Sequence, residues 1–219
     1  SPRSLFPEDP LFMGYQEQMT RVLVTGAYGY LGGRIVEALA GSGFEIFPGS
    51  RVGREDPNSR ITDFEDPASL AMACVGMDAV VHLAGSNEIA SARDPARALY
   101  ETAGFTQRLA RAATASGVAR FLYFSTVHVY GSPLEGELSE ASPARPAHPY
   151  SIAHRAAEDY ALMEGGKGGM ESVVVRLSNG FEGAVEVHAA DDVDLLAHRT
   201  ALEAVGLVLA PLLVLPLQA

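Results

Sequence analysis

Short apolar runs without polar alternation recur along the chain and are separated by segments with helical periodicity. The runs predicted as strands are RVLVT (21–25), FEIFPGS (44–50), DAVVHLAG (78–85), ARFLYFST (119–126) and ESVVVRLS (171–178), with a short one at 60–63. Helices are expected at 30–43, about 67–75, about 95–116 and from Pro149 onward. Strands that are apolar on both faces and alternate with helices indicate a parallel sheet covered on both sides. We therefore expect an α/β fold with a doubly wound parallel sheet.

Three glycines lie at the first strand–helix junction, where Gly26, Gly29 and Gly32 have the spacing GxxGxxG. A tight turn, a bare backbone beside a pyrophosphate and a close helix–strand contact each require glycine. The start of the following helix offers N–H groups and a positive dipole end to phosphates. The junction therefore predicts a dinucleotide-binding loop. The alternative is a tight turn whose glycines serve packing only.

The segment HPYSIAHRAAEDY (148–160) places Tyr150 four residues before His154. Residues at this spacing share one face of a helix, so the phenol and the imidazole are expected to point to the same place. Three interpretations follow from the pattern. The two residues are a catalytic pair, a catalytic pair with one altered member, or two ordinary side chains.

Charge and cysteine content narrow the classes of partner. The 219 residues have a formal net charge of −11, which argues against a nucleic-acid-binding surface because such surfaces need basic patches. The single cysteine, Cys74, cannot form an internal disulfide, which favours a reducing compartment, and we expect the cytoplasm. No metal site is predicted, because the six histidines are scattered and no CxxC is present.

The two ends of the chain differ from its middle. Residues 1–19 are expected to form an irregular arm, because they contain three prolines and lack the pattern of a secretory signal. The C-terminal run AVGLVLAPLLVLPLQA is very apolar but is interrupted by Pro211 and Pro216. It is also shorter than the about 20 residues that a membrane-spanning helix needs, so no membrane association is predicted.

Five motifs occur in order between about residue 20 and residue 181: TGAYGYLG, VVHLAG, FSTVHVYG, PYSIAH and VVVRLSN. Together they resemble the extended short-chain dehydrogenase/reductase family, and most closely its nucleotide-sugar epimerase/dehydratase branch. The resemblance implies a Rossmann-like NAD(P)-binding domain over residues 20–182, acting on a small-molecule nucleotide sugar by hydride transfer.

The resemblance also assigns roles to individual residues. Tyr150 is expected to be the catalytic acid/base, with Thr126 as its hydrogen-bonding partner and His154 at the position of the family lysine. The substrate-binding residues implied are Thr126, His128 and Asn179. The cofactor-binding residues implied are Gly26, Tyr28, Gly29, Tyr30, Leu31, Gly32, Arg51, Asp63, Phe64, Leu83, Ala84, Gly85, Tyr150 and His154.

The segment after the second predicted strand bears on the choice of cofactor. NAD enzymes generally place an acidic residue there for the ribose 2′-hydroxyl, whereas this chain has Ser50, Arg51 and Arg54 before its first acid, Glu55. An arginine suits a 2′-phosphate through charge-assisted hydrogen bonds, so Arg51 favours NADP over NAD. The alternative is that Arg51 is a solvated loop residue. By resemblance, Asp63 is expected near the adenine.

Two departures from the family pattern affect the expected chemistry. A free tyrosine has a pKa of about 10, and a nearby cation lowers it, but histidine is mostly neutral at pH 7 and supplies little field from position 154. The 4,6-dehydratases of the family have an Asp-Glu pair after the catalytic threonine, where this chain has Val127 and His128. Sugar dehydration is therefore disfavoured.

A further departure lies beyond RLSNG, where the resemblance ends. Residues 183–219 are expected to be a divergent tail: a divergent cap, a truncated substrate lobe, or an out-of-frame segment of a longer gene. A cofactor-binding half alone exposes apolar surface, which favours association, with a homodimer as the expected form. Two functions remain open: an NAD(P)-dependent nucleotide-sugar epimerase or oxidoreductase, and a catalytically weak or inactive NAD(P)-binding subunit or sensor.

Overall fold

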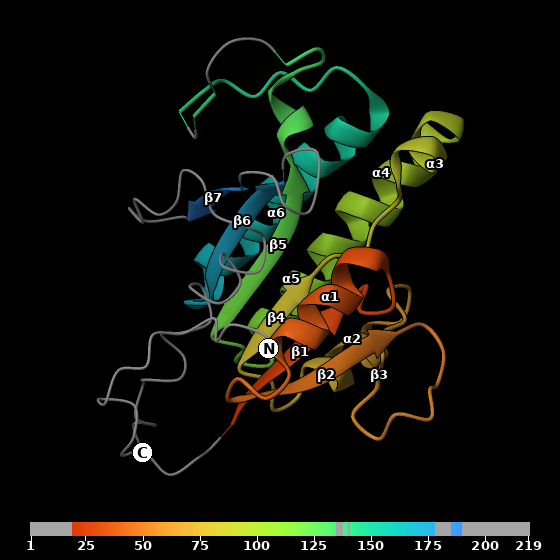
Figure 1. Ribbon diagram of the computed structural model, residues 1–219, viewed down its shortest axis with the longest axis vertical. Helices are drawn as coiled ribbons and strands as arrows, with labels where there is room; N and C mark the ends of the chain where they lie inside the picture. The colour runs from red at the N-terminus through yellow and green to blue at the C-terminus, as the bar shows by residue number, and fades with distance from the viewer. Residues whose placement is uncertain (1–18, 135–137, 140, 178–184, 190–219) are drawn as a thin grey trace.

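The computed structural model describes residues 19–134, 138–139, 141–177 and 185–189 of the chain. Within these residues one seven-stranded sheet has the order β3-β2-β1-β4-β5-β6-β7 (Figure 1). The strands are β1 (Thr20–Thr25), β2 (Phe44–Ser50), β3 (Arg60–Ile61), β4 (Ala79–His82), β5 (Arg120–Thr126), β6 (Glu171–Leu177) and β7 (Val185–Ala189). The first six are parallel, and β7 pairs antiparallel with β6. The predicted doubly wound parallel sheet is confirmed.

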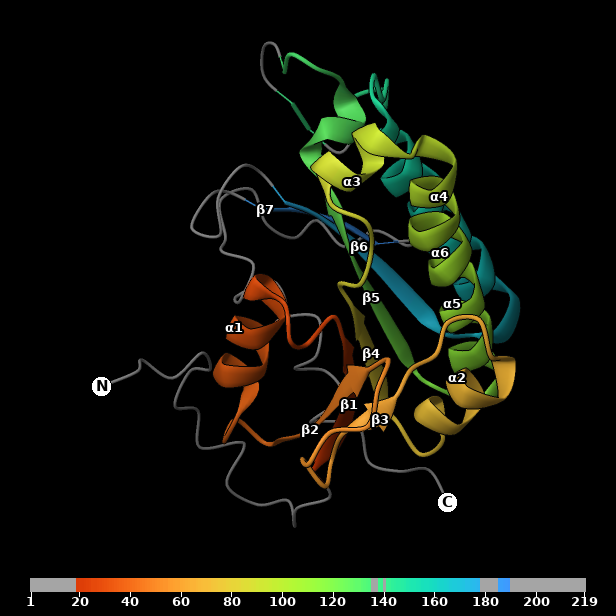
Figure 2. The ribbon, with the colours of Figure 1, turned by 90° about the vertical axis from the view of Figure 1, so that its right-hand side faces the viewer.

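Helices lie on both faces of the sheet. They are α1 (Tyr30–Leu39), α2 (Pro67–Cys74), α3 (Glu88–Arg93), α4 (Pro95–Leu99), α5 (Phe105–Ala115) and α6 (Pro149–Gly168). Figure 2 shows α1 on one side of the sheet and α2, α4, α5 and α6 on the other. No described helix is long and apolar enough to cross a membrane.

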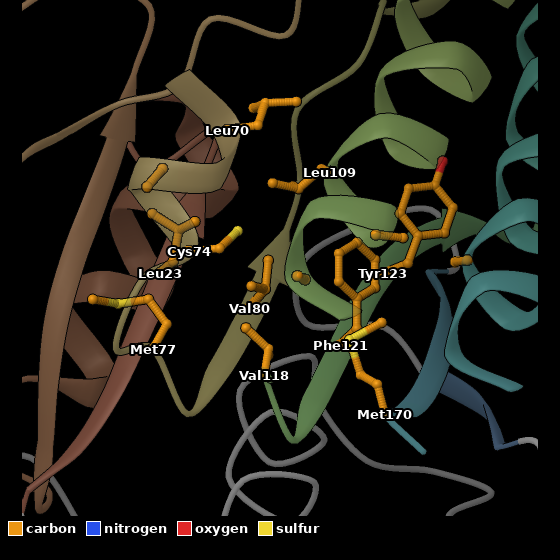
Figure 3. Packing of buried hydrophobic residues seen from close by; sticks show 14 of the residues in the cluster. Leu23, Leu70, Cys74, Met77, Val80, Leu109, Val118, Phe121, Tyr123 and Met170 are labelled. Carbon is orange, nitrogen blue, oxygen red and sulfur yellow. The ribbon is translucent and has the colours of Figure 1, made fainter. Parts of the chain in front are cut away.

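The apolar strands pack against both helix layers, which explains why they lack polar alternation. On the side of α5 and α6, Leu23, Val80 and Phe121 belong to one buried cluster, part of which Figure 3 shows. Their chain neighbours Val24 and Val81 point the other way and belong to a second buried cluster that includes residues of α1. Successive strand residues therefore fill two cores.

The strand order reverses between β1 and β4, which are hydrogen-bonded neighbours although β2 and β3 lie between them in sequence. In open parallel sheets, ligands bind beyond the carboxyl ends of the strands at such a reversal. In this protein the reversal brings two segments together: the glycine loop that follows β1 and residues 83–85, which follow β4.

The long helix expected at 95–116 is interrupted. A π-helical turn over Tyr100–Gly104 separates α4 from α5, and α3 precedes them as a helix that the apolar pattern did not indicate. Asn87 caps α3 by accepting a hydrogen bond from the Ala90 N–H at 2.9 Å. The helix expected at 30–43 ends at Leu39, and Gly41 with φ +76° follows it in a conformation that favours glycine.

Helix α6 begins where its sequence indicated, with Pro149 as the first residue. His148 and Ser151 form a reciprocal capping arrangement, in which each side chain accepts a hydrogen bond from the other's backbone N–H. This fixes the start of the helix that carries Tyr150 and His154.

Several sequence-based predictions concern parts of the chain outside the described residues. All of the expected N-terminal arm except residue 19 lies outside the described residues. The predicted tail also lies outside them, except for β7. Strand β7 lies beyond the boundary expected at residue 182 and adds five residues of the predicted tail to the sheet. The division at 182 stays a prediction.

Candidate active site at the carboxyl edge of the sheet

The three glycines of the β1–α1 loop meet three different local requirements. Gly26 has φ +75°, and a Cβ there would lie 3.0 Å from the backbone of Leu83 and Ala84. A Cβ on Gly32 would lie 2.1 Å from the Gly26 carbonyl oxygen, so α1 can approach the loop only with glycine at this position. Gly29 is exposed, and the one atom near its Cβ position is the Gly26 oxygen at 3.2 Å.

Gly29 is also the N-cap of α1, and it offers no side chain to cap the helix. The first turn of α1 contains no acidic residue. An exposed helix start without a capping side chain or a nearby carboxylate leaves N–H groups and positive dipole for an anion. The loop therefore has the geometry that a dinucleotide pyrophosphate needs. Tyr28 and Tyr30 flank it with exposed rings, and Leu31 is half-buried behind it.

The segment after β2 brings Arg54, rather than Arg51, toward the glycine loop. The Arg54 guanidinium lies 4.5 Å from the centre of the Tyr28 ring, and its Nε donates to Ser50 Oγ at 3.2 Å. Arg51 lies in the exposed loop that follows β2. The sequence placed Arg54 beside Arg51 but gave no reason to prefer it, because the stacking on Tyr28 depends on the fold.

Asp63 and Phe64 follow β3 and face different surroundings. Asp63 is exposed, and its carboxylate accepts the Glu65 N–H at 2.9 Å. The Phe64 ring is buried against Phe105, with ring centres 4.9 Å apart. The Phe64 side chain is thus part of the core, and the Phe64 carbonyl oxygen accepts a hydrogen bond from Arg108 at 3.0 Å.

Hydrogen bonds connect the residues that follow β4 to the π-helical turn. Thr102 accepts the Ser86 N–H at 3.2 Å, and the Ser86 hydroxyl donates to Glu101 at 2.9 Å. Gly85 is exposed and lies against Thr102, because a Cβ on it would be 3.4 Å from the threonine side chain. The turn thereby holds the strip formed by half-buried Leu83 and Ala84 and exposed Gly85, opposite the glycine loop.

The carboxyl end of β5 and the start of α6 place the three candidate catalytic residues together. Tyr150 and His154 lie edge to face, with ring centres 4.4 Å apart, as their spacing predicted. Thr126 is the last residue of β5, and its side chain is close enough to the Tyr150 phenol to lower the pKa of that phenol. His154 is 8% exposed, and its Nδ1 lies 2.7 Å from the Tyr123 hydroxyl.

The surroundings hold both ring systems in their neutral forms. Burial lowers the His154 pKa to about 4, against a smaller opposite effect of Glu158. Burial also raises the pKa of Tyr150, the Glu88 carboxylate adds to the rise, and the hydrogen bond to Thr126 opposes it. His154 is thus uncharged at neutral pH, and Tyr150 is a protonated phenol.

An ion pair that the sequence did not reveal lies behind these residues. Arg176 donates to both Glu158 oxygens, at 2.8 and 2.6 Å, and Glu158 accepts the Ser125 hydroxyl at 2.5 Å. Arg176 also donates to the Tyr130 hydroxyl at 2.7 Å. Ser125 and Tyr130 flank Thr126 in sequence, so the pair fixes the corner that carries it. The available signal was an arginine inside the apolar run VVVRLS.

His128 and Asn179 are the two other residues expected to bind the substrate. His128 is half-buried near the start of α6, with its ring centre 5.7 Å from that of His148. It therefore lies on the side of the site where Tyr150 emerges. Asn179 lies outside the described residues.

Comparison with known proteins agrees with this geometry. The model of the NAD dependent epimerase/dehydratase family matches residues 22–195, which is most of the chain. The chain belongs to this family. The motifs from which the resemblance was inferred lie within the matched range.

Individual family members and solved structures match to a similar extent. A dTDP-glucose 4,6-dehydratase of Streptomyces griseus is 34% identical over 74% of this chain and 55% of its own length. A UDP-glucose 4-epimerase of Streptomyces lividans is 26% identical over 73% of this chain and 52% of its own. A short-chain dehydrogenase/reductase superfamily protein of Agrobacterium tumefaciens, solved with bound NAD, has a TM-score of 0.63 and 30% identity, covering 71% of this chain and 48% of that one. The chain thus spans about half the length of these epimerase/dehydratase relatives.

Proposed function

We propose that this protein binds NAD(P) along the carboxyl edge of its sheet and acts as a nucleotide-sugar epimerase or oxidoreductase. The observation that carries the proposal is the convergence of two independent features at this edge. The exposed Gly29 at the start of α1 suits a pyrophosphate, and Tyr150 and His154 lie with ring centres 4.4 Å apart beside Thr126, the last residue of β5. The names of the relatives and the NAD in one solved neighbour support the same assignment.

The protonation state of Tyr150 favours one direction of the reaction. A bound reduced nicotinamide would supply a hydride to the carbonyl carbon of a keto-sugar. Tyr150, protonated at neutral pH, would donate its proton to the carbonyl oxygen while Thr126 orients that oxygen. The reverse oxidation needs the phenolate, which the raised pKa disfavours. We therefore propose that carbonyl reduction is the faster half-reaction at pH 7.

The second candidate function is a catalytically weak or inactive NAD(P)-binding subunit or sensor, and one observation favours it specifically. His154 is buried and neutral where the family pattern has a lysine, so Tyr150 lacks the cation that would lower its pKa. The chain matches only about half the length of each relative, so how it binds a substrate is a proposal.

Calorimetric titration of the full chain with NADH and NADPH tests the cofactor proposal. Gly29→Val would place a branched side chain at the exposed N-cap, where the pyrophosphate would lie, whereas the backbone at φ −80° tolerates it. We expect the variant to lose most of the binding heat while remaining folded by circular dichroism. Equal heats for native and variant proteins would refute the proposal. Turnover with UDP- and dTDP-linked keto-sugars would then separate the enzyme from the binding subunit.

The preference for NADP over NAD is a finer proposal, and Arg54 now supports it together with Arg51. Arg54 stacks on Tyr28 and bonds Ser50, which places a guanidinium between the end of β2 and the glycine loop. We expect Arg54→Ala and Arg51→Ala to weaken NADPH binding more than NADH binding. Tighter binding of NADH than of NADPH by the native chain would contradict the preference.

Association into a homodimer and a cytoplasmic location remain parts of the proposal. Tyr160 and Met163 expose 41% and 44% of their surface on α6, which offers apolar area to a second copy. Cys74 is buried, and its burial raises the thiol pKa to about 12, consistent with an unreactive free thiol. Sedimentation velocity of the full chain tests the dimer.

A further inference from the structure

His82 is a buried titratable residue that the proposed chemistry does not use, and its two ring nitrogens join three elements of the fold. It is the last residue of β4 and is 0% exposed. Its Nδ1 lies 2.6 Å from Oγ1 of Thr25, the last residue of β1, and its Nε2 lies 3.0 Å from Oγ1 of Thr106, in the first turn of α5. The imidazole therefore bridges the strand that leads into the glycine loop and the helix that follows the π-helical turn.

The direction of this bridge is set at Thr106. Its hydroxyl donates to the Thr102 carbonyl oxygen, in the π-helical turn, at 2.7 Å. A carbonyl oxygen only accepts and a hydroxyl has one proton, so Thr106 Oγ1 can only accept from His82 Nε2, which must therefore carry a proton. Burial, together with the nearby His154, lowers the His82 pKa to about 3. The ring is thus neutral, and its Nδ1 accepts from the Thr25 hydroxyl.

The hydrogen bonds of the bridge consequently run in one direction, from the end of β1 to the π-helical turn. Each group donates to the next, from the Thr25 hydroxyl through the imidazole and the Thr106 hydroxyl to a carbonyl of the turn. Hydrogen bonds aligned in this way strengthen one another where the dielectric is low. Three aromatic rings have centres 5.6 to 5.9 Å from that of the imidazole: Phe64, Phe121 and Tyr123, the last two labelled in Figure 3. The bridge therefore lies in an apolar part of the core.

The bridge ends at the segments that form the proposed cofactor edge. Strand β1 runs directly into the glycine loop and β4 runs into the strip 83–85, so Thr25 and His82 are the residues just before each segment. The π-helical turn holds the strip, because Thr102 Oγ1 accepts the Ser86 N–H at 3.2 Å. Backbone hydrogen bonds join β1 to β4, whereas the turn and α5 meet this edge through side chains. The imidazole therefore connects the turn, and with it the strip, to the glycine loop.

We propose that His82 is a positioning residue that sets the spacing between the glycine loop and the strip held by the π-helical turn, between which the dinucleotide would lie. The effect on dinucleotide binding rests on the proposed function, whereas the bridge itself does not. Histidine suits the position because one flat ring accepts at one nitrogen and donates at the other, which an apolar side chain cannot do. If binding depends on one net hydrogen bond of this bridge, its loss should weaken affinity roughly 2- to 10-fold.

The bridge is measurable in the ligand-free full chain. Long-range proton–nitrogen correlation on protein labelled with ¹⁵N-histidine, with His82→Leu to assign the signals, should show a protonated Nε2 and an unprotonated Nδ1 at pH 7. Thr106→Ser keeps the hydroxyl and should give the same signals. Amide hydrogen exchange of Ser86 reports how firmly the strip is held, and it should be faster in His82→Leu and Thr106→Val than in the native chain. A protonated Nδ1 in the native chain, or unchanged exchange at Ser86 in both variants, would overturn the proposal.

A double variant separates positioning from a merely structural role. His82→Leu leaves the Thr25 hydroxyl buried without its partner, and Thr25→Val/His82→Leu removes that hydroxyl as well, which should recover thermal stability. Calorimetric titration with NADH should give roughly 2- to 10-fold weaker binding in both variants, because neither restores the bridge. Val118→Ala, which removes apolar volume from the same core cluster, should bind as the native chain does. Native affinity in the double variant would overturn the proposal.

Failure of the proposed function has a different signature. A native chain that binds neither NADH nor NADPH would refute the proposed function, and the protonated nitrogen of His82 and the exchange of Ser86 would still test the bridge. A native chain that binds NADH with an affinity that His82→Leu and Thr106→Val retain would refute the positioning role alone.

Discussion

Two buried histidines make the stability of this protein sensitive to mild acid. His82 and His154 are 0% and 8% exposed, and burial is the main cause of pKa values of about 3 and about 4 instead of 6.5. In the unfolded chain both residues take up protons as the pH falls through 6.5, whereas in the folded chain they remain neutral. Their contribution to stability is therefore complete above pH 6.5 and is lost progressively from pH 6.5 down to about 4 for His154 and about 3 for His82.

The magnitude follows from the gap between folded and unfolded pKa values. A pH of 5 is about 1.5 units below the pKa of each histidine in the unfolded chain and is above its pKa in the folded chain. Each histidine therefore lowers the free energy of unfolding by about 2 kcal/mol at this pH. The two together should lower the free energy of unfolding by about 4 kcal/mol between pH 7.5 and pH 5. This is a large part of the stability of an ordinary domain, which is about 5–15 kcal/mol.

Urea denaturation followed by far-ultraviolet circular dichroism measures this loss, because the chain contains no tryptophan for fluorescence. Staying at pH 5 or above limits the contribution of Glu158, whose pKa is lowered by its hydrogen bonds to Arg176 and Ser125 against the effect of burial. That contribution is present above the unfolded pKa of about 4.5 and is lost only at lower pH.

The matched variant is His154→Gln, which is polar but does not titrate. It should lose about 2 kcal/mol rather than about 4 kcal/mol between pH 7.5 and pH 5, because His82 alone contributes. Contributions from the other histidines are common to both proteins and cancel in the difference. If native and variant proteins lose the same free energy, His154 is not buried in its neutral form and the reasoning fails.

Three further predictions concern packing, the buried ion pair and catalysis. Gly32→Ala would place a Cβ 2.1 Å from a backbone oxygen and should lower stability by about 1–3 kcal/mol. Gly33→Ala, whose Cβ would have its nearest neighbour 3.7 Å away, should raise stability by about 0.5–1 kcal/mol. Equal melting temperatures for the two variants would contradict this prediction. Arg176→Met leaves the Glu158 carboxylate buried without its main partner and should lower the free energy of unfolding in urea by about 3–5 kcal/mol. The double variant Arg176→Met/Glu158→Leu should lose less. A loss below about 1 kcal/mol in Arg176→Met would be inconsistent with a buried ion pair. Under the proposed function, His154→Lys restores a cation beside the catalytic phenol and should raise turnover at pH 7 by roughly 5- to 150-fold, measured as hydride transfer with a panel of nucleotide sugars; a slower variant would show that the imidazole is the better residue.

The sheet was predictable from sequence because its strands are buried on both faces. Val80 and Val81 point to opposite cores, and a short run in which both kinds of position are apolar is typical of a strand between two helix layers. The start of α6 was predictable for a similar local reason, since proline suits a first helical position. Pairs close in sequence, such as Tyr150 and His154, also follow from helical spacing.

The parts that sequence did not reveal depend on contacts between distant segments. The π-helical turn at Tyr100–Gly104 has no side-chain pattern of its own, and its bonds to Ser86 come from a segment about 15 residues away. Tyr123 and His154 are 31 residues apart, so nothing local indicated that they share a hydrogen bond. The pairing of Arg176 with Glu158 likewise required the packing of α6 on β6.

A crystal structure of the full chain with bound NAD(H) or NADP(H) tests the central claim most directly. We predict that the pyrophosphate lies against Gly29 at the start of α1 and that the nicotinamide ribose contacts both Tyr150 and His154. A dinucleotide bound elsewhere on the protein, or no dinucleotide at this edge at saturating concentration, would contradict the account.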